Sequence, residues 1–254
     1  MYLRLQWLVE SQAILPQEQM DFRSNRSCTD SLITLTNNIH TNFLANEVVA
    51  AAFLDITGVF DVLPEVVLSE KIGVPARLRK FIENIVTHRS VHFVEEGHLS
   101  EAYSVQKRIP QGSMLSPLFL FNISVLEMDL QLHPGTNFLQ YANDIVVYSS
   151  SRQIGEVVAN LQSSLNMIYL YLSNKGLELS PTKIGFNWIL FSNRKHSVKE
   201  DSTFKIFTNN HLVERVFNVR FLGIILDCRL KGEDHFKIIK KEKSLINVLF
   251  LAAV

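Results

Sequence analysis

The sequence is poor in cysteine and has no long hydrophobic run. Two cysteines, Cys28 and Cys228, occur in 254 residues, and neither is part of a CxxC pair. This composition argues against a zinc site or a disulfide framework, and we expect reduced thiols in an intracellular protein. No apolar stretch reaches the roughly 18 residues that a membrane span requires, and no secretory signal pattern opens the chain. We therefore expect no membrane partner, and no targeting signal distinguishes nucleus from cytoplasm.

The chain also has no net charge, because 25 basic residues balance 25 acidic ones. Zero net charge argues against a protein that binds nucleic acid by electrostatics alone. The charges are unevenly distributed, however. From Lys183 onward there are 13 Lys or Arg against 7 Asp or Glu, whereas the first 182 residues hold 12 against 18. A basic C-terminal third could follow a phosphate backbone, or these could be ordinary solvated surfaces.

Two polar residues interrupt the most hydrophobic part of the chain. Asn143 and Asp144 lie between the run ending in Tyr141-Ala142 and the β-branched and aromatic run 145–148. Asn-Asp is typical of turns, so the pattern predicts a tight hairpin with a carboxylate at its tip. A solvent-exposed turn is the simplest interpretation. The alternative is a metal site, which needs a second carboxylate from elsewhere in the chain.

Asp55 is the candidate for that second carboxylate. Residues 47–56 form a nearly continuous apolar run, which is typical of a strand buried on both faces, and Asp55 stands near its end. Asp55 could simply cap the following turn. If its strand neighbours the one after Asn143, however, the carboxylates meet at one edge of a sheet. Such a cluster can bind two Mg²⁺ ions that orient a 3′-hydroxyl and stabilise a leaving pyrophosphate.

The remaining pattern predicts a chain that mixes helices and strands. Apolar residues recur at helical spacing in several segments, and short β-type runs lie between them. Arg23 and Arg26 belong to a polar loop and could be phosphate contacts or plain loop charges. The expected helices are 1–17, 29–45, one opening at Pro75, 117–130 and 158–172, the last ending before Gly176; the expected β segments are 91–106, 187–191, 204–208 and 215–226.

Five motifs, in order along the chain, resemble those of reverse transcriptases, and in particular the jockey-like non-LTR retrotransposons of insects. One contains Asp55, the next is the Pro-Gln-Gly-Ser loop, and the third, Tyr-Ala-Asn-Asp, resembles the family's Tyr-Ala-Asp-Asp box. Each motif is weak alone, but their common order is specific. The motifs occupy residues 53–61, 109–117, 141–144, 176–183 and 221–227.

The resemblance implies an α+β, right-hand polymerase fold with fingers and palm, an antiparallel palm sheet with packed helices, and a thumb largely missing. One reverse transcriptase domain would cover residues 1–254. Fingers would comprise 1–47 and 66–106, palm 48–65 and 107–230, and the start of a thumb 231–254. Further fingers and thumb sequence is expected beyond both ends, so the chain is interpreted as a fragment.

The resemblance also assigns roles to individual residues. Asp55, Asn143 and Asp144 would be catalytic. Asp55, Asp144 and the Ile56 carbonyl would bind two Mg²⁺ ions, for which Mn²⁺ could substitute. Leu222 and Gly223 would form the primer grip. The residues expected to contact nucleotide or template are Arg23, Arg26, Phe60 (a steric gate against the ribose 2′-hydroxyl), Gln111, Gly112 and Lys183 (a proton donor to pyrophosphate).

One of these positions departs from the family pattern. Asn143 stands where the family has a metal-binding Asp, and an amide keeps an oxygen but loses the negative charge that Mg²⁺ favours. The expected function is an RNA-directed DNA polymerase that uses an RNA template, a DNA primer and dNTPs. The alternative is a catalytically inactive remnant of that fold that at most binds nucleic acid. An unrelated soluble α+β domain would require the five ordered motifs to be a coincidence.

Overall fold

The computed structural model describes residues 2–57, 75–87, 89–95, 97–105, 128, 131–179, 186–193 and 203–241. Four predicted site residues lie outside the described residues, namely Phe60, Gln111, Gly112 and Lys183. The helix expected over 117–130 also lies outside them, apart from residue 128. In the part of the chain that is described, no helix is long and apolar enough to cross a membrane.

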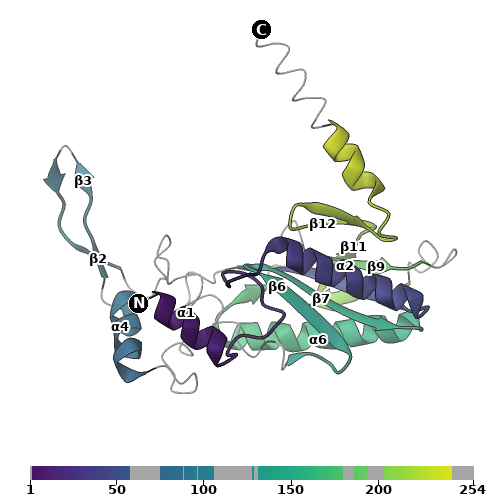
Figure 1. The fold of residues 1–254 in the computed structure, drawn as a ribbon, viewed down its shortest axis with the longest axis horizontal. Helices are drawn as coiled ribbons and strands as arrows, with labels where there is room; N and C mark the ends of the chain where they lie inside the picture. The colour runs from purple at the N-terminus through teal and green to yellow at the C-terminus, as the bar shows by residue number, and fades with distance from the viewer. Residues whose placement is uncertain are drawn as a thin grey trace, which may run out of the picture.

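The described elements include both helices and strands, as the sequence predicts (Figure 1). The helices are α1 (Tyr2–Ser11), α2 (Cys28–Leu44), α4 (Ala76–Thr87) and α6 (Ile154–Asn174). The strands are β1 (Val48–Thr57), β2 (Arg89–Val91), β3 (Val94–Glu95), β4 (His98–Leu99), β5 (Tyr103–Val105), β6 (Thr136–Tyr141), β7 (Asp144–Ser151), β8 (Glu178–Leu179), β9 (Asn187–Phe191), β10 (Ile206–Thr208), β11 (His211–Arg215), β12 (Asn218–Phe221) and β13 (Ile224–Asp227).

The centre of the fold is a sheet of seven strands in which β1 is an interior strand. The strand order is β10-β11-β9-β1-β7-β6, and β8 pairs with the end of β1. Strands β7 and β9 both run antiparallel to β1, whereas β11 runs parallel to β9. The prediction that this apolar run forms a strand buried on both faces is therefore confirmed. Residues 48–53 of β1 are at most 3% exposed.

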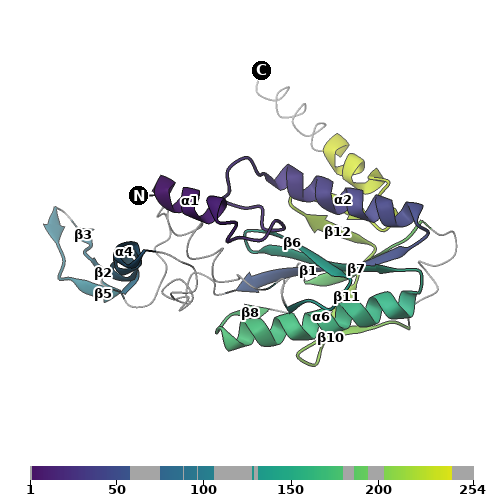
Figure 2. The same cartoon turned by 60° about the horizontal axis from the view of Figure 1, so that its bottom comes forward.

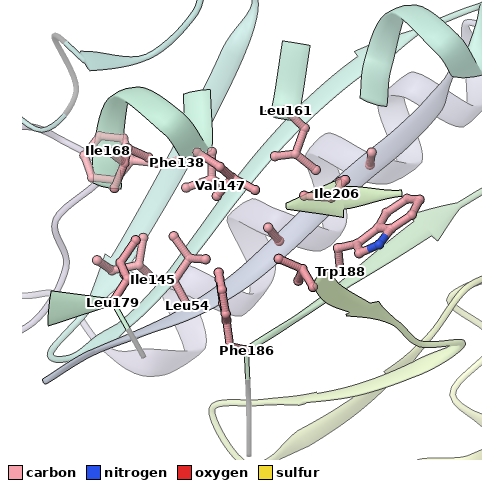
Figure 3. Close-up of a cluster of buried hydrophobic side chains, with 14 of the residues drawn as sticks. Leu54, Phe138, Ile145, Val147, Leu161, Ile168, Leu179, Phe186, Trp188 and Ile206 are labelled. Atoms are coloured by element: carbon pink, nitrogen blue, oxygen red, sulfur yellow. The ribbon is translucent and has the colours of Figure 1, made fainter. Parts of the chain in front are cut away.

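Two helices cover opposite faces of this sheet (Figure 2). Side chains alternate between the faces of a strand, so Val49, Ala51 and Phe53 pack toward α2, in a cluster with Leu35 and Ile39. The intervening residues of β1 pack toward α6. Figure 3 shows this second cluster, in which Leu54 and Val147 of the sheet pack with Leu161 and other α6 side chains.

The helix boundaries follow local signals where such signals exist. Helix α2 begins after Ser27, which forms a reciprocal capping box with Asp30. Helix α6 ends just before Gly176, whose φ of 72° suits the left-handed conformation after a helix. Helix α1 ends at Ser11 rather than near residue 17, because the chain turns at Ala13, with φ of 48°, and buries Leu15.

The smaller predicted hairpins also form. Strands β3 and β4 pair around Gly97 within the β2–β5 ribbon, as expected for residues 91–106. Figure 1 shows this ribbon projecting away from the central sheet. Near the C-terminus, β12 pairs with β13, and residues 233–241 form the basic helix that follows.

Candidate active site

The sheet brings the two predicted metal-binding carboxylates together. Strands β1 and β7 pair in a register that sets Asp55 directly opposite Asp144. Directly opposed side chains share one face of a sheet and have Cβ atoms about 5 Å apart. The face is the one that α2 covers, because Phe53 and Val146, two residues away on each strand, belong to that cluster. Non-local strand pairing therefore gathers the carboxylates at one end of the sheet.

The turn that carries Asp144 is displaced by one residue from the expected position. Tyr141 pairs with Asp144, so Ala142 and Asn143 form the two-residue turn and Asp144 begins β7. The expectation of a turn centred on Asn143 and Asp144 was thus one residue late. Ala142 has a φ of 52°, a left-handed conformation that is strained for alanine by about 1–3 kcal/mol.

Asn143 links the turn to β1 through two hydrogen bonds. Its side-chain Nδ2 donates to Asp55 Oδ1 over 2.9 Å, and its backbone oxygen accepts from the Ile56 amide over 3.3 Å. Asp55, Ile56, Asn143 and Asp144 therefore lie together in the structure. The amide of Asn143 thus donates to one of the two carboxylate oxygens of Asp55.

The carboxylates of Asp55 and Asp144 carry like charges and repel each other. Desolvation by the surrounding protein, followed by the negative charge of Asp55, raises the pKa of Asp144 above its ordinary value. Like charges directly opposite one another destabilise a sheet, and a bound cation would offset that repulsion.

The donor chemistry of the site fits a hard divalent cation. Two carboxylates and a backbone carbonyl are oxygen ligands, which Mg²⁺ prefers. Among the described residues, the cluster contains two acidic side chains, and no group of three His, Cys, Asp or Glu could hold a metal. Asn143 stands at the place where a third carboxylate would complete such a group.

The predicted primer-grip residues lie on the same face of the sheet. Leu222 and Gly223 form the turn between β12 and β13, with φ of 47° and 84°. Such paired positive values are typical of tight hairpin turns. Phe221 packs edge-to-face against Phe53 with ring centroids 5.2 Å apart, so the hairpin contacts β1 two residues before Asp55.

The two predicted arginines are not part of this cluster. Arg23 is buried and binds Glu10 through two hydrogen bonds of 2.9 and 2.7 Å, and it also donates to the carbonyls of Pro16 and Gln19. The Arg26 guanidinium donates to the backbone oxygen and to the side-chain Oε1 of Gln17. In this structure both guanidinium groups hold the N-terminal segment, and their contact with a nucleotide stays a prediction.

Sequence reasoning missed a segment that borders the site. Gln19 and Asp21 are each only 1% exposed, although they lie in or beside the stretch interpreted as a polar loop. Gln19 forms a parallel bridge with Gln140, and the Met20 amide donates to the Gln140 carbonyl over 3.0 Å. No local sequence pattern predicts these contacts, because the partner residues lie on a hairpin far along the chain.

Comparison with known proteins identifies a family and individual proteins with similar sequences. The family described as "Reverse transcriptase (RNA-dependent DNA polymerase)" matches residues 1–226. The RNA-directed DNA polymerase from mobile element jockey of Drosophila melanogaster is 26% identical over 231 residues, which are 87% of this chain and 24% of that protein. The probable RNA-directed DNA polymerase from transposon X-element of the same species is 24% identical over 237 residues, which are 92% of this chain and 25% of that protein. The chain thus spans about a quarter of the length of these curated relatives.

Solved structures show the same fold. An apo telomerase from Candida tropicalis, truncated from its C-terminal domain, superposes with a TM-score of 0.57 at 12% identity over 91% of this chain and 43% of that one. A telomerase from the same species in complex with a fragment of telomeric RNA gives a TM-score of 0.56 at 11% identity over 91% of this chain and 37% of that one. Sheet, helices and ordered motifs thus agree with a polymerase fold, and the chain belongs to the reverse transcriptase family of RNA-dependent DNA polymerases.

Proposed function

We propose that this chain is the part of a retrotransposon RNA-directed DNA polymerase that transfers nucleotides to a primer 3′-hydroxyl. The observation that carries the proposal is the register that sets Asp55 opposite Asp144 on one face of the sheet. The names of the curated relatives, which are polymerases of mobile elements, support the same reaction. The substrates would be an RNA template, a DNA primer and dNTPs, handled inside the cell.

The roles proposed for individual residues rest on the resemblance of their motifs to those of the family. Asp55 and Asp144 would hold Mg²⁺ at the end of β1 and β7, where the Ile56 carbonyl is a further oxygen donor. When bound, such a metal would activate the 3′-hydroxyl and stabilise charge on the leaving pyrophosphate. Two ions are expected by family resemblance, and Mn²⁺ could replace Mg²⁺. The turn of Leu222 and Gly223 would support the primer near Phe53.

The proposed roles of the nucleotide-binding residues complete this account. Phe60 would stand beside the sugar of the incoming nucleotide and disfavour a ribose. Gln111 and Gly112 would line the template and nucleotide pocket, and Lys183 would donate a proton to pyrophosphate. These four residues lie outside the described part of the chain, so the support for their roles is the matching motif alone.

Primer extension on an RNA template tests the proposed activity. The chain and its Asp55→Ala variant are compared with Mg²⁺ and then with Mn²⁺, and the product lengths are measured. Extension by the chain that Asp55→Ala abolishes supports the proposal. Equal extension by both proteins would contradict the role of Asp55.

A second candidate function is favoured by the hydrogen bond from Asn143 to Asp55. A neutral amide that occupies a carboxylate oxygen weakens a cation site, so the chain could retain the fold and bind nucleic acid without catalysis. Template–primer binding that does not change when metal is removed, together with no extension, supports this candidate.

A further inference from the structure

The loop after β13 is organised around one carboxylate, that of Asp227 at the end of the strand. Its Oδ1 accepts from the backbone amide of Arg229 over 3.0 Å and from that of Lys231 over 3.1 Å. Its Oδ2 accepts from the backbone amide of Gly232 over 2.7 Å. Hydrogen bonds to an ionised acceptor are roughly twice as strong as those between neutral groups. The Asp227 side chain therefore holds most of the loop that joins the β12–β13 hairpin to the basic helix 233–241.

The backbone of this loop depends on such a contact. Leu230 has a φ of 51°, a left-handed conformation that leucine rarely adopts. The two amides that donate to Asp227 Oδ1 belong to the residues on either side of it, Arg229 and Lys231. The Leu230 amide itself donates to the Asp227 carbonyl over 2.9 Å. Strained backbone persists where the surrounding contacts over-determine it, and here Asp227 supplies those contacts.

The basic helix is also bound directly to the hairpin. Asn218, which stands opposite Asp227 in the register of β12 and β13, donates through Nδ2 to Asp234 Oδ2 over 2.8 Å. The other Asp234 oxygen accepts from Lys237 Nζ over 2.6 Å. Both strands of the hairpin thus hold the start of the helix, at the end away from the predicted primer-grip turn. Figure 1 shows the described part of this helix, in yellow, leaving the hairpin away from the central sheet.

The loop and the helix carry an excess of positive charge. Residues 228–241 contain five Lys or Arg against two Asp or Glu. All five basic residues are exposed, namely Arg229, Lys231, Lys237, Lys240 and Lys241. Exposed basic side chains bind nucleic acid by neutralising its phosphates and releasing the counterions. The charge of this surface therefore fits the backbone of a duplex whose primer strand reaches the turn at the other end of the hairpin.

We propose that Asp227 is a positioning residue, whose carboxylate sets the direction of the basic helix relative to the predicted primer-grip turn. Lys240 and Lys241 are thereby held where they contact the phosphates of the template–primer duplex. The inference rests on the proposed function, because that function supplies the duplex. Removal of the Asp227 carboxylate makes the chain more positive and nevertheless weakens duplex binding, since the basic side chains are no longer held along one backbone.

The test compares Asp227→Ala, Asp227→Asn and the matched control Glu233→Gln. Each variant removes one negative charge from the same region, but Glu233 is an exposed residue whose ion pair with Lys231 spans 3.9 Å. Asn keeps a side-chain oxygen that can accept from the Arg229 and Lys231 amides, whereas Ala has none. Two properties are measured on each folded protein: hydrogen exchange of single backbone amides without nucleic acid, and the Kd for an RNA–DNA template–primer duplex at several salt concentrations.

We expect the Arg229 and Lys231 amides to exchange about tenfold faster or more in Asp227→Ala than in the parent chain. The same variant should bind the duplex about three- to tenfold more weakly, with a salt dependence reduced by about one phosphate contact. Asp227→Asn should stay within about threefold of the parent in both properties, because one acceptor oxygen remains. Glu233→Gln should keep the parent's exchange rates and bind the duplex at least as tightly, because it only makes the region more positive.

Three results would overturn the proposal. The first is unchanged exchange in Asp227→Ala, and the second is duplex binding by Asp227→Ala as tight as that by Glu233→Gln, which would show that charge alone matters. The third is equal acceleration in Asp227→Asn, which would show that the acceptor oxygen does not matter. The Phe207 amide, which donates to Gln162 Oε1 over 2.7 Å, reports on general loosening. Equal acceleration at Phe207 would also contradict a local role for Asp227.

A double variant, Lys240→Gln with Lys241→Gln, separates this inference from the proposed function. If the parent chain binds the duplex and the double variant binds it as tightly, the helix does not contact the duplex. The inference is then wrong, and the proposed function is unaffected. A parent chain that binds no duplex would contradict the proposed function and the duplex contact together. Amide exchange still decides whether Asp227 holds the loop, because it is measured without nucleic acid.

Discussion

Asn143 donates a hydrogen bond of 2.9 Å to Asp55 across 88 residues of sequence, and this contact defines the chemistry of the site. The donor is an amide on a two-residue turn, and the acceptor is one of the two carboxylates that the sheet register brings together. The contact stabilises the turn without metal. It also places a neutral amide beside Asp55 where a charged ligand would favour a cation, so the residue that stabilises the turn contributes little to metal binding.

Replacement of Asn143 by Asp should lower the stability of the metal-free fold and strengthen metal binding. Without metal, Asn143→Asp places a third negative charge beside Asp55 and Asp144, and we expect a lower melting temperature than in the parent chain. Saturating Mn²⁺ should raise its melting temperature more than that of the parent, since a ligand at about 100 times its Kd adds about 2.7 kcal/mol. The control is Asn137→Asp on the exposed face of β6. Equal shifts with Mn²⁺ in all three proteins would contradict this prediction.

Asp21 should make the fold less stable as pH rises. Its folded-state pKa is raised from 3.8 to about 7, so the folded chain keeps the proton over a range in which the unfolded chain has lost it. The free energy of unfolding should therefore fall between about pH 4 and pH 7, by at most about 4 kcal/mol. Asp21→Asn removes this effect, and urea unfolding at pH 5 and pH 8 measures it. The same pH dependence in both proteins would show that Asp21 is not the cause.

Arg23 should contribute more to stability than Arg26. Its side chain is 4% exposed and bound to Glu10 at 2.7 Å, so Arg23→Ala leaves a partly buried carboxylate and two carbonyls without their donor. We expect a loss of about 2–4 kcal/mol in the free energy of unfolding. Arg26→Ala should cost no more than about 1 kcal/mol. If Arg23→Ala instead weakens nucleotide binding and leaves the free energy of unfolding unchanged, its role is contact with the ligand.

The packing of α6 against the sheet should depend on the buried apolar side chains of the helix. Leu165 is fully buried against the sheet, whereas Leu170 on the same helix is 60% exposed. Leu165→Ala should lower the free energy of unfolding by about 2–5 kcal/mol. Leu170→Ala is the matched control and should change it by about 0.5 kcal/mol or less. Similar losses in the two variants would contradict the described orientation of α6.

The elements that sequence patterns predicted correctly are those with strong local signals. The apolar run of β1, the helical spacing in α6 with Gly176 after it, and the strand β9 all follow from periodicity and end residues. The capping box of Ser27 and Asp30 fixes the start of α2 in the same way. Such signals involve residues that are close together in the sequence. They can therefore be recognised without knowledge of the tertiary fold.

The features that the sequence did not predict depend on contacts between distant segments. The pairing of Asp55 with Asp144 required the assumption that their strands are neighbours, and the turn was placed one residue late because Ala142 accepts an unusual φ. Asp21 is buried beside the bridge that joins Gln19 to Gln140 of β6, and Arg23 pairs with Glu10, 13 residues earlier in the chain. A polar composition indicated an exposed loop there, and tertiary contacts overrode it.

Primer extension by the Asn143→Asp variant tests most directly the claim that Asp55, residue 143 and Asp144 form one catalytic metal site. The parent chain, Asn143→Asp, and Asn143→Asp with Asp55→Ala are compared on one RNA template with Mg²⁺ in excess. We expect Asn143→Asp to extend the primer about 10²- to 10³-fold faster than the parent chain, and the added Asp55→Ala to abolish extension. If folded Asn143→Asp extends no faster than the parent, or if extension survives Asp55→Ala, the account of this site is wrong.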